Sequence, residues 1–222
     1  MGLASRCVMI AIIDYDMGNL RSVQKAFAAV GHEAVVTRDR RVINDADRVV
    51  LPGVGAFADC MTNLDRYGLI EPIRKAILAG KPFLGICLGL QLLFTESEEF
   101  GVHPGLGILA GRVRRFPFGN GSQIAPAPDG TGGLKIPHVG WNAVSISRTA
   151  PPLRATASGA HFYFVHSYYV EPADASIACG RTEYGFPFVS SIWRDNIFAC
   201  QFHPEKSQSA GLSVVRNFAE WT

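Results

Sequence analysis

Residues 8–37, VMIAIIDYDMGNLRSVQKAFAAVGHEAVVT, contain two strand patterns separated by a helix pattern. The stretch opens with an unbroken apolar run, which is typical of a buried strand. After the turn YDMGN, apolar residues from Leu20 to Val30 recur at the spacing of one helix face, and Gly31 ends the helix. EAVVT then forms the second strand. This order predicts a parallel pair of strands joined by a crossover helix.

The same alternation continues through the first half of the chain. RVVLPGVG at 48–55 and PFLGI at 82–86 are strand patterns, and residues 58–80 between them predict one or two helices. Open α/β sheets bind their ligands beyond the carboxyl ends of the strands. We therefore expect a cleft where these strands end.

The second half consists of short β-like runs separated by turns, followed by a helix around residues 209–221. RDN at 194–196 predicts a hairpin turn. The predicted fold class is therefore α/β: a flavodoxin-like open mixed sheet flanked by helices, with an additional antiparallel strand region in the C-terminal half. The length of 222 residues, 48% of them hydrophobic, suits one sizeable core, so we expect a single domain over residues 1–222. The Gly- and Pro-rich residues from Gly119 to Gly133 predict a surface loop.

Charge and cysteine content exclude several classes of function. The formal net charge is +2 and basic residues cluster only in pairs, so nothing indicates a nucleic-acid or membrane partner. The five cysteines are odd in number and scattered, which favours a cytoplasmic protein with reduced thiols. Cys200 and His203 have the spacing of metal ligands but lack a second pair nearby, so we expect no metal.

Cys87 lies between two glycines at a predicted strand-to-helix turn. The pentapeptide GICLG, from Gly85 to Gly89, fits the nucleophile-elbow pattern with cysteine in the place of the nucleophile. We expect a helix from Leu88 toward Phe94, whose N-terminus would favour the reactive thiolate. A buried, unreactive cysteine in an apolar run is the alternative.

A thiol nucleophile needs a base, and the base needs a group that orients it. CQFHPEKS, at residues 200–207, supplies His203 and Glu205, which would project to the same side of an extended segment. The pattern predicts a Cys87–His203–Glu205 triad if the two strands lie side by side. Attack on a carbonyl also requires N–H donors for the oxyanion. The flexible stretch at Gly53 and Val54, with the N–H of Leu88, is the predicted source of these donors.

Three motifs occur in a diagnostic order: PGVG at 52–55, GICLGLQLL at 85–93 and FHPEKS at 202–207. Together they resemble the class I (triad) glutamine amidotransferases, which hydrolyse L-glutamine to glutamate through a cysteine thioester and pass the ammonia to a synthase. Further segments resemble one branch, the glutaminase subunits of imidazole glycerol phosphate synthase in histidine biosynthesis; they are DYDMGNLRSV (14–23), PHVGWN (137–142), YFVHSYY (163–169) and TEYG (182–185).

The resemblance implies roles for further residues and needs no cofactor. Substrate contacts fall on Gly55, Gln91, Glu99, Ser167 and Tyr168. The implied partner is a (β/α)₈-barrel cyclase, which uses the ammonia to make imidazole glycerol phosphate and aminoimidazole carboxamide ribonucleotide. The implied interface with that partner comprises Asn19, Pro137, His138, Trp141, Tyr163 and Lys206.

Three alternatives remain open on the sequence alone. The chain would be a related glutaminase that feeds another barrel synthase, a noncatalytic interaction subunit, or a hydrolase of γ-glutamyl peptides. The loop from Gly119 to Gly133 is longer than the family pattern, so docking geometry is expected to differ there.

Overall fold

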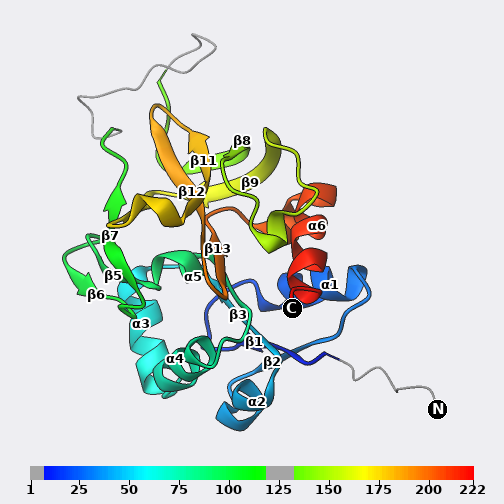
Figure 1. The fold of residues 1–222 in the computed structure, drawn as a ribbon. Coiled ribbons are helices and arrows are strands. Elements are labelled where there is room, and N and C mark those ends of the chain that lie inside the picture. Colours follow the sequence, from blue (N-terminus) through cyan, green and yellow to red (C-terminus); the bar gives the residue numbers. More distant parts are fainter. Residues whose placement is uncertain (1–7, 119–132) are drawn as a thin grey trace.

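A computed structural model describes residues 8–118 and 133–222. Parallel strands form the centre of its sheet (Figure 1). In spatial order they are β2 (Ala34–Thr37), β1 (Ile10–Ile13), β3 (Arg48–Gly53), β4 (Phe83–Cys87) and β13 (Ile197–Cys200). All neighbouring pairs within this group are parallel. The order is that of flavodoxin-like sheets, so the carboxyl ends of β3 and β4 lie side by side.

Beyond β13 the sheet becomes largely antiparallel, as the sequence predicts. Its path continues through β12 (Pro187–Arg194), β10 (Tyr168–Pro172), β7 (Leu109–Arg115), β5 (Phe94–Ser97) and β6 (His103–Pro104). A branch leaves β12 through β11 (Ala178–Glu183) to β8 (His138–Ile146) and β9 (Ala160–His166). The predicted RDN hairpin is present, because Arg194 pairs with Ile197 across a two-residue turn.

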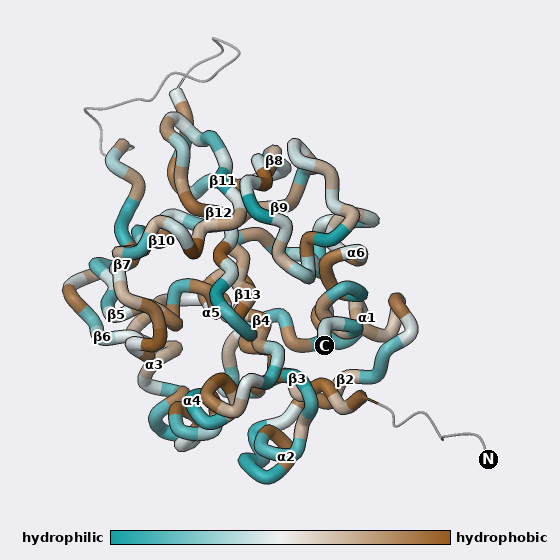
Figure 2. The backbone as a smooth tube through the Cα atoms, viewed as in Figure 1, coloured by the Kyte–Doolittle hydropathy of each residue, from teal (hydrophilic) through white to brown (hydrophobic). Residues whose placement is uncertain are grey.

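Helices cover both faces of the parallel core. Ile10 and Ile12 of β1 belong to one apolar cluster, while Ala11 and Ile13 belong to the other, as the alternation of a strand requires. The first cluster packs under α1 (Leu20–Ala29) and α6 (Gln208–Ala219), and the second under α2 (Arg40–Asp45), α3 (Phe57–Arg66) and α4 (Ile70–Leu78). Figure 2 shows hydrophilic and hydrophobic residues alternating along the peripheral helices α2 and α4.

The helix predicted after Cys87 is much shorter than expected. It covers only Leu88–Gln91 (α5), and the chain enters β5 at Phe94. Residues of the 105–109 segment donate to the carbonyls of Leu92, Leu93 and Phe94. These tertiary hydrogen bonds compete with the continuation of the helix, because an apolar run such as LQLLF is compatible with a buried strand as well.

Short 3₁₀ helices complete the described chain at Pro151–Leu153, Ala175–Ile177 and Pro204–Lys206. None of the described helices is long and apolar enough to cross a membrane. The predicted surface loop falls on residues 119–132, which lie outside the described part of the chain, so its length and role stay predictions.

Candidate active site

Cys87 ends β4 in a backbone conformation that side chains rarely adopt, with φ 55° and ψ −109°. The two flanking glycines make this turn possible. A Cβ atom at Gly89 would lie 1.9 Å from the Leu51 carbonyl oxygen, and one at Gly85 would lie 2.8 Å from the Gly89 oxygen. The predicted elbow is therefore present, and its backbone strain is of the kind that concentrates at functional sites.

His203 and Glu205 form a buried pair. His203 Nδ1 lies 2.8 Å from Glu205 Oε1, and the two side chains are 2% and 1% exposed. The predicted extended segment is wrong, because Pro204 begins a single 3₁₀ turn. Proline suits the first turn of a helix, since its missing N–H would have no partner there. The turn folds Glu205 back under the imidazole.

Strand pairing brings the imidazole to the thiol. β13 lies parallel to β4, with Cys200 opposite Ile86, so the segment after β13 reaches the elbow. Burial alone lowers the pKa of His203, but hydrogen bonding and charge from Cys87 and Glu205 outweigh burial and raise the pKa above its ordinary value. His203 Nε2 has no well-aligned hydrogen bond within the described residues, so its contact with the thiol is loose. Such contacts often tighten only when substrate binds.

A cavity of about 280 Å³ opens at the thiol, large enough for a small amino acid. Cys87, Leu88 and His203 line it, together with the predicted Val54, Gly55, Gln91, Glu99, Ser167 and Tyr168. Gly53 and Glu205 are not lining residues. Pro137, predicted at the interface, does line the cavity, as do Val165 and His166, which the sequence analysis did not select. Val165 and His166 belong to the YFVHSYY motif, so this motif was the feature of the sequence that could have identified them as cavity residues.

Two side chains donate hydrogen bonds to backbone carbonyl groups of the PGVG stretch. Tyr15 Oη donates to the Pro52 carbonyl oxygen at 2.8 Å, and the Cys60 thiol donates to the Val54 carbonyl oxygen at 3.7 Å. Gly53 lies opposite Cys87 in the β3–β4 register, and a Cβ there would lie 2.8 Å from Tyr15 Oη. Gly53 thus permits close packing beneath the cavity, while Val54 and Gly55 form its wall.

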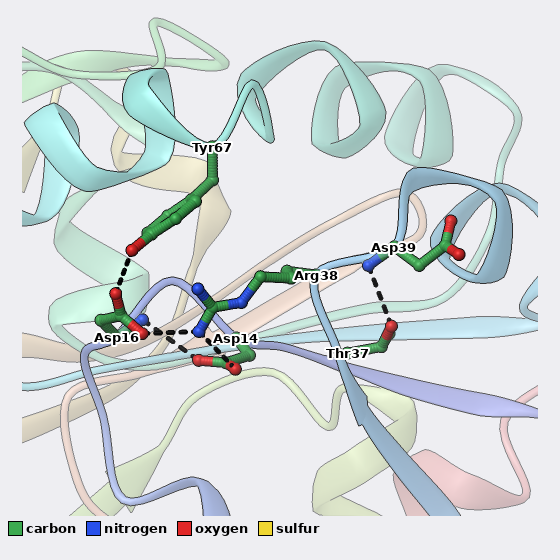
Figure 3. Close-up of polar contacts among 6 residues, drawn as sticks. All are labelled: Asp14, Asp16, Thr37, Arg38, Asp39 and Tyr67. Atoms are coloured by element: carbon green, nitrogen blue, oxygen red, sulfur yellow. Dashed lines mark hydrogen bonds and ion pairs between the residues drawn. The ribbon is translucent and has the colours of Figure 1, made fainter.

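A network of charged residues fixes the DYDMGN loop that carries Tyr15. Arg38, just after β2, contacts Asp14 at 2.8 Å and Asp16 at 2.5 Å, and Tyr67 at the end of α3 donates to Asp16 (Figure 3). The hydrogen bond from Tyr67, followed by that from Arg38, lowers the pKa of Asp16. The network joins the ends of β1, β2 and α3 through Asp14 and Asp16, the two residues that flank Tyr15.

Gln91 can offer the cavity only an acceptor. Its Nε2 donates to the Tyr168 carbonyl oxygen at 3.1 Å and to Gln201 Oε1 at 2.9 Å, so both amide hydrogens are used. The remaining amide oxygen suits an ammonium group better than a carboxylate.

Glu99 caps a helix beside the cavity. Its Oε2 accepts a 2.6 Å hydrogen bond from the backbone N–H of Phe57, the first residue of α3. No side chain at the N-cap residue Ala56 does this. The same carboxylate raises the pKa of Tyr168, after the larger effect of burial. Glu99 therefore brings negative charge to the cavity from a fixed position.

The residues predicted at a partner interface divide into two groups. Trp141 and Tyr163 are paired across β8 and β9 with their rings 6.1 Å apart, and Lys206 lies 5.7 Å from the Tyr163 ring. Trp141 is 46% exposed, and its neighbours Val139 and Val165 are also exposed. Asn19, in contrast, is the N-cap residue of α1. The His138 side chain is only 3% exposed, so it cannot offer a partner a large contact in this state.

His138 instead belongs to a buried polar chain. His166 Nδ1 donates to the Tyr168 carbonyl oxygen at 2.8 Å, so its neutral ring must accept at Nε2. His138 Nδ1 is 3.0 Å from that atom and is therefore the donor, and its own Nε2 accepts from Asn142 at 3.3 Å. Burial lowers the pKa of His138 to about 4 and that of His166 to about 3. The described residues contain no group of His, Cys, Asp and Glu side chains arranged to hold a metal.

An elbow cysteine and a buried His–Glu pair, with Cys87 and His203 lining one cavity, form an arrangement that suits a thiol hydrolase on a flavodoxin-like sheet. The family model "Glutamine amidotransferase class-I" matches residues 11–221. The chain belongs to this family.

Two relatives specify the branch. A protein of Syntrophotalea carbinolica named imidazole glycerol phosphate synthase subunit HisH is 56% identical over 96% of this chain and 100% of its own length. The protein of the same name from Geobacter sulfurreducens is 54% identical over 95% of this chain and 98% of its own length. Among solved structures, PurLQS from Thermotoga maritima matches with a TM-score of 0.71 at 16% identity, covering 96% of this chain and 98% of that one. That likeness concerns the fold alone.

Proposed function

We propose that this chain is the glutaminase subunit of an imidazole glycerol phosphate synthase and serves histidine biosynthesis. The family match and the near full-length relatives named HisH support this role. The observation that carries the chemistry is that the strained Cys87 and His203 line one cavity, while the buried Glu205 is paired with His203.

The proposed reaction begins with L-glutamine in the cavity. The Cys87 thiolate attacks the side-chain amide carbon, and the N–H groups of Val54 and Leu88 stabilise the oxyanion. His203 donates its proton to the departing ammonia, which leaves a thioester. His203 then removes a proton from water, which attacks the thioester and releases glutamate and the thiol. Glu205 orients the imidazole and stabilises its charged form.

Charge in the cavity supports glutamine as the substrate. Glu99 and the free oxygen of Gln91 are both acceptors, which suits the α-ammonium group. Ser167 and Tyr168 also line the cavity and complete the proposed contacts.

The proposed partner is a (β/α)₈-barrel cyclase that receives the ammonia. Apolar side chains are exposed on β8 and β9 at Val139, Trp141 and Val165, and Val165 also lines the cavity. Aromatic anchors of this kind are favoured in interfaces. His203 N donates to the Tyr163 carbonyl oxygen at 2.9 Å, so the proposed interface strand also supports the catalytic imidazole.

The test is reconstitution of the complex with its cognate cyclase. Cys87→Ala is expected to abolish formation of imidazole glycerol phosphate from glutamine and to leave synthesis from ammonium salts intact. Loss of both activities would contradict the division of labour.

Failure of the wild-type pair to make the imidazole product, with glutaminase activity retained, would favour a related glutaminase that serves another synthase. Cleavage of γ-glutamyl peptides without any partner would favour the hydrolase.

A further inference from the structure

Gln201 is fully buried between the proposed nucleophile and Gln91, and it is not a lining residue of the cavity. Gln201 follows the last residue of β13, and its backbone N–H donates to the Ser190 carbonyl oxygen at 2.8 Å. Its Nε2 lies 3.5 Å from Cys87 Sγ, and its Oε1 lies 2.9 Å from Gln91 Nε2. This side chain has no task in the proposed hydrolysis of glutamine.

The direction of these hydrogen bonds is set by a backbone carbonyl. An amide side chain can usually be turned over, which exchanges its donor and its acceptor. The Tyr168 carbonyl oxygen cannot donate, so Gln91 must direct its Nε2 toward it. The second hydrogen of Gln91 Nε2 then points at Gln201, whose side-chain oxygen Oε1 must accept it. The NH₂ group of Gln201 is thereby left facing the sulfur.

Tyr168 is itself held by a second donor. His166 Nδ1 donates to the same carbonyl oxygen, and His166 is bound through His138 to Asn142. The carbonyl that determines the orientation is therefore anchored from two sides. A run of hydrogen bonds extends from Asn142 on β8 to the thiol at the elbow.

We propose that Gln201 is a positioning residue that donates an amide hydrogen to the Cys87 thiolate and that Gln91 and Tyr168 hold this donor in place. The proposal rests on the proposed function of Cys87 as the nucleophile. A donor aimed at sulfur stabilises the thiolate relative to the thiol and fixes its direction of attack. The four-residue α5 is too short to provide this stabilisation through a helix dipole.

Other ionisable groups surround the sulfur, so the experiment must leave them unchanged. They are His203 and Glu205 after β13, Cys200 on β13, Tyr15 after β1, Cys60 on α3, His166 on β9 and Glu99 after β5. All are retained when Gln201 is replaced.

Gln201→Glu is the sharpest variant, because it keeps an oxygen for Gln91 and exchanges the donor for an oxygen. The matched control is Gln24→Glu on α1. Gln24 also donates its amide, to the Ala34 carbonyl oxygen, and it does not line the cavity. Gln201→Met provides an uncharged second variant of similar length in case the buried carboxylate prevents folding.

The first readout is the rate of Cys87 alkylation by iodoacetamide against pH, followed by mass spectrometry on the full chain. The midpoint of this profile is expected to move to higher pH in both Gln201 variants and to stay unchanged in Gln24→Glu. Because alkylation requires no glutamine, this readout stands even if the proposed function fails. Unchanged profiles in folded Gln201 variants would overturn the proposal.

The second readout is glutaminase activity of the complex with the cyclase. We expect kcat to fall roughly 10- to 100-fold in Gln201→Glu, as for loss of a hydrogen bond to a charged group, with KM for glutamine little changed. A rise in KM alone would overturn the proposal, because it would make Gln201 a support for substrate binding.

Discussion

Gly89 determines how closely the elbow approaches the neighbouring strand. A Cβ at this residue would lie 1.9 Å from the Leu51 carbonyl oxygen, which is backbone and cannot rotate away. Gly53 and Gly85 relieve similar contacts on either side. The strained conformation of Cys87 therefore depends on neighbours that lack side chains.

Gly89→Ala is expected to lower the free energy of unfolding by about 1–3 kcal/mol, because overpacking forces the backbone to shift. Glutaminase activity is expected to be lost, since the shift moves the nucleophile. Urea denaturation and a glutamate-release assay measure the two effects. The control is Gly31→Asn, at a positive φ with open space around it, which asparagine tolerates. An unchanged urea midpoint in Gly89→Ala would contradict the packing argument.

At the scale of elements, Glu99 joins the segment after β5 to the N-terminus of α3. One carboxylate oxygen caps the helix through Phe57, and the side chain also faces the cavity. A substitution can separate the two roles of Glu99, because capping the helix needs only a hydrogen-bond acceptor, whereas binding an ammonium group needs a negative charge.

Glu99→Gln is expected to keep most of the stability and to raise KM for glutamine at least tenfold. Glu99→Ala is expected to raise KM similarly and to cost about 1 kcal/mol of unfolding free energy through the lost cap. Asp59→Asn is the control, since it removes a charge from the first turn of the same helix at a residue outside the cavity. Equal kinetics for Glu99→Gln and wild type would exclude the ammonium contact.

At the scale of the whole molecule, the buried His138–His166 pair makes stability depend on pH. The pKa of each ring is lowered by burial, to about 4 and about 3, whereas an unfolded histidine titrates near 6.5. Between these values the unfolded chain binds more protons, so acid favours unfolding. The raised pKa of His203 acts in the opposite sense, but its contribution is complete below about pH 6.5 and does not vary in this window.

The free energy of unfolding is therefore expected to fall as the pH decreases from about 6.5 to about 4. Urea titrations across this range test the trend, and NMR titration of the histidine C2 protons tests its origin. His138 and His166 should remain neutral at pH 5. Midpoints near 6.5 for both rings would refute the explanation.

The exposed face of β8 and β9 gives a further prediction about assembly. Trp141→Ala is expected to raise the Kd for the cyclase about tenfold or more, as for an aromatic anchor, without changing the urea midpoint of the isolated chain. Leu78→Ala, on the exposed side of α4, is the control for loss of surface apolar area. Titration calorimetry measures the Kd of each variant for the cyclase. Equal affinities would exclude this face as the centre of the interface.

Much of this site was predictable because it depends on local pattern. Alternating strands and helices predicted the parallel core, and glycines on both sides of Cys87 predicted the elbow. The type and order of Cys87, His203 and Glu205 predicted the triad. Local patterns failed at the early end of α5, where tertiary hydrogen bonds compete with the helix. They also failed at Pro204, where hydrogen bonds from Lys206 to His203 and from Ser207 to Pro204 close a 3₁₀ turn in place of the expected extended segment.

The sequence by itself determined the fold class and the residue types at the candidate active site, because strand and helix periods and glycine turns are properties of neighbouring residues. Only the tertiary structure decided the partners of Gln201, His138 and Glu99. Gln201 meets a sulfur 114 residues away, and His138 a ring 28 residues away. The direction of such hydrogen bonds depends on one backbone carbonyl that β10 places between them, which no local pattern encodes.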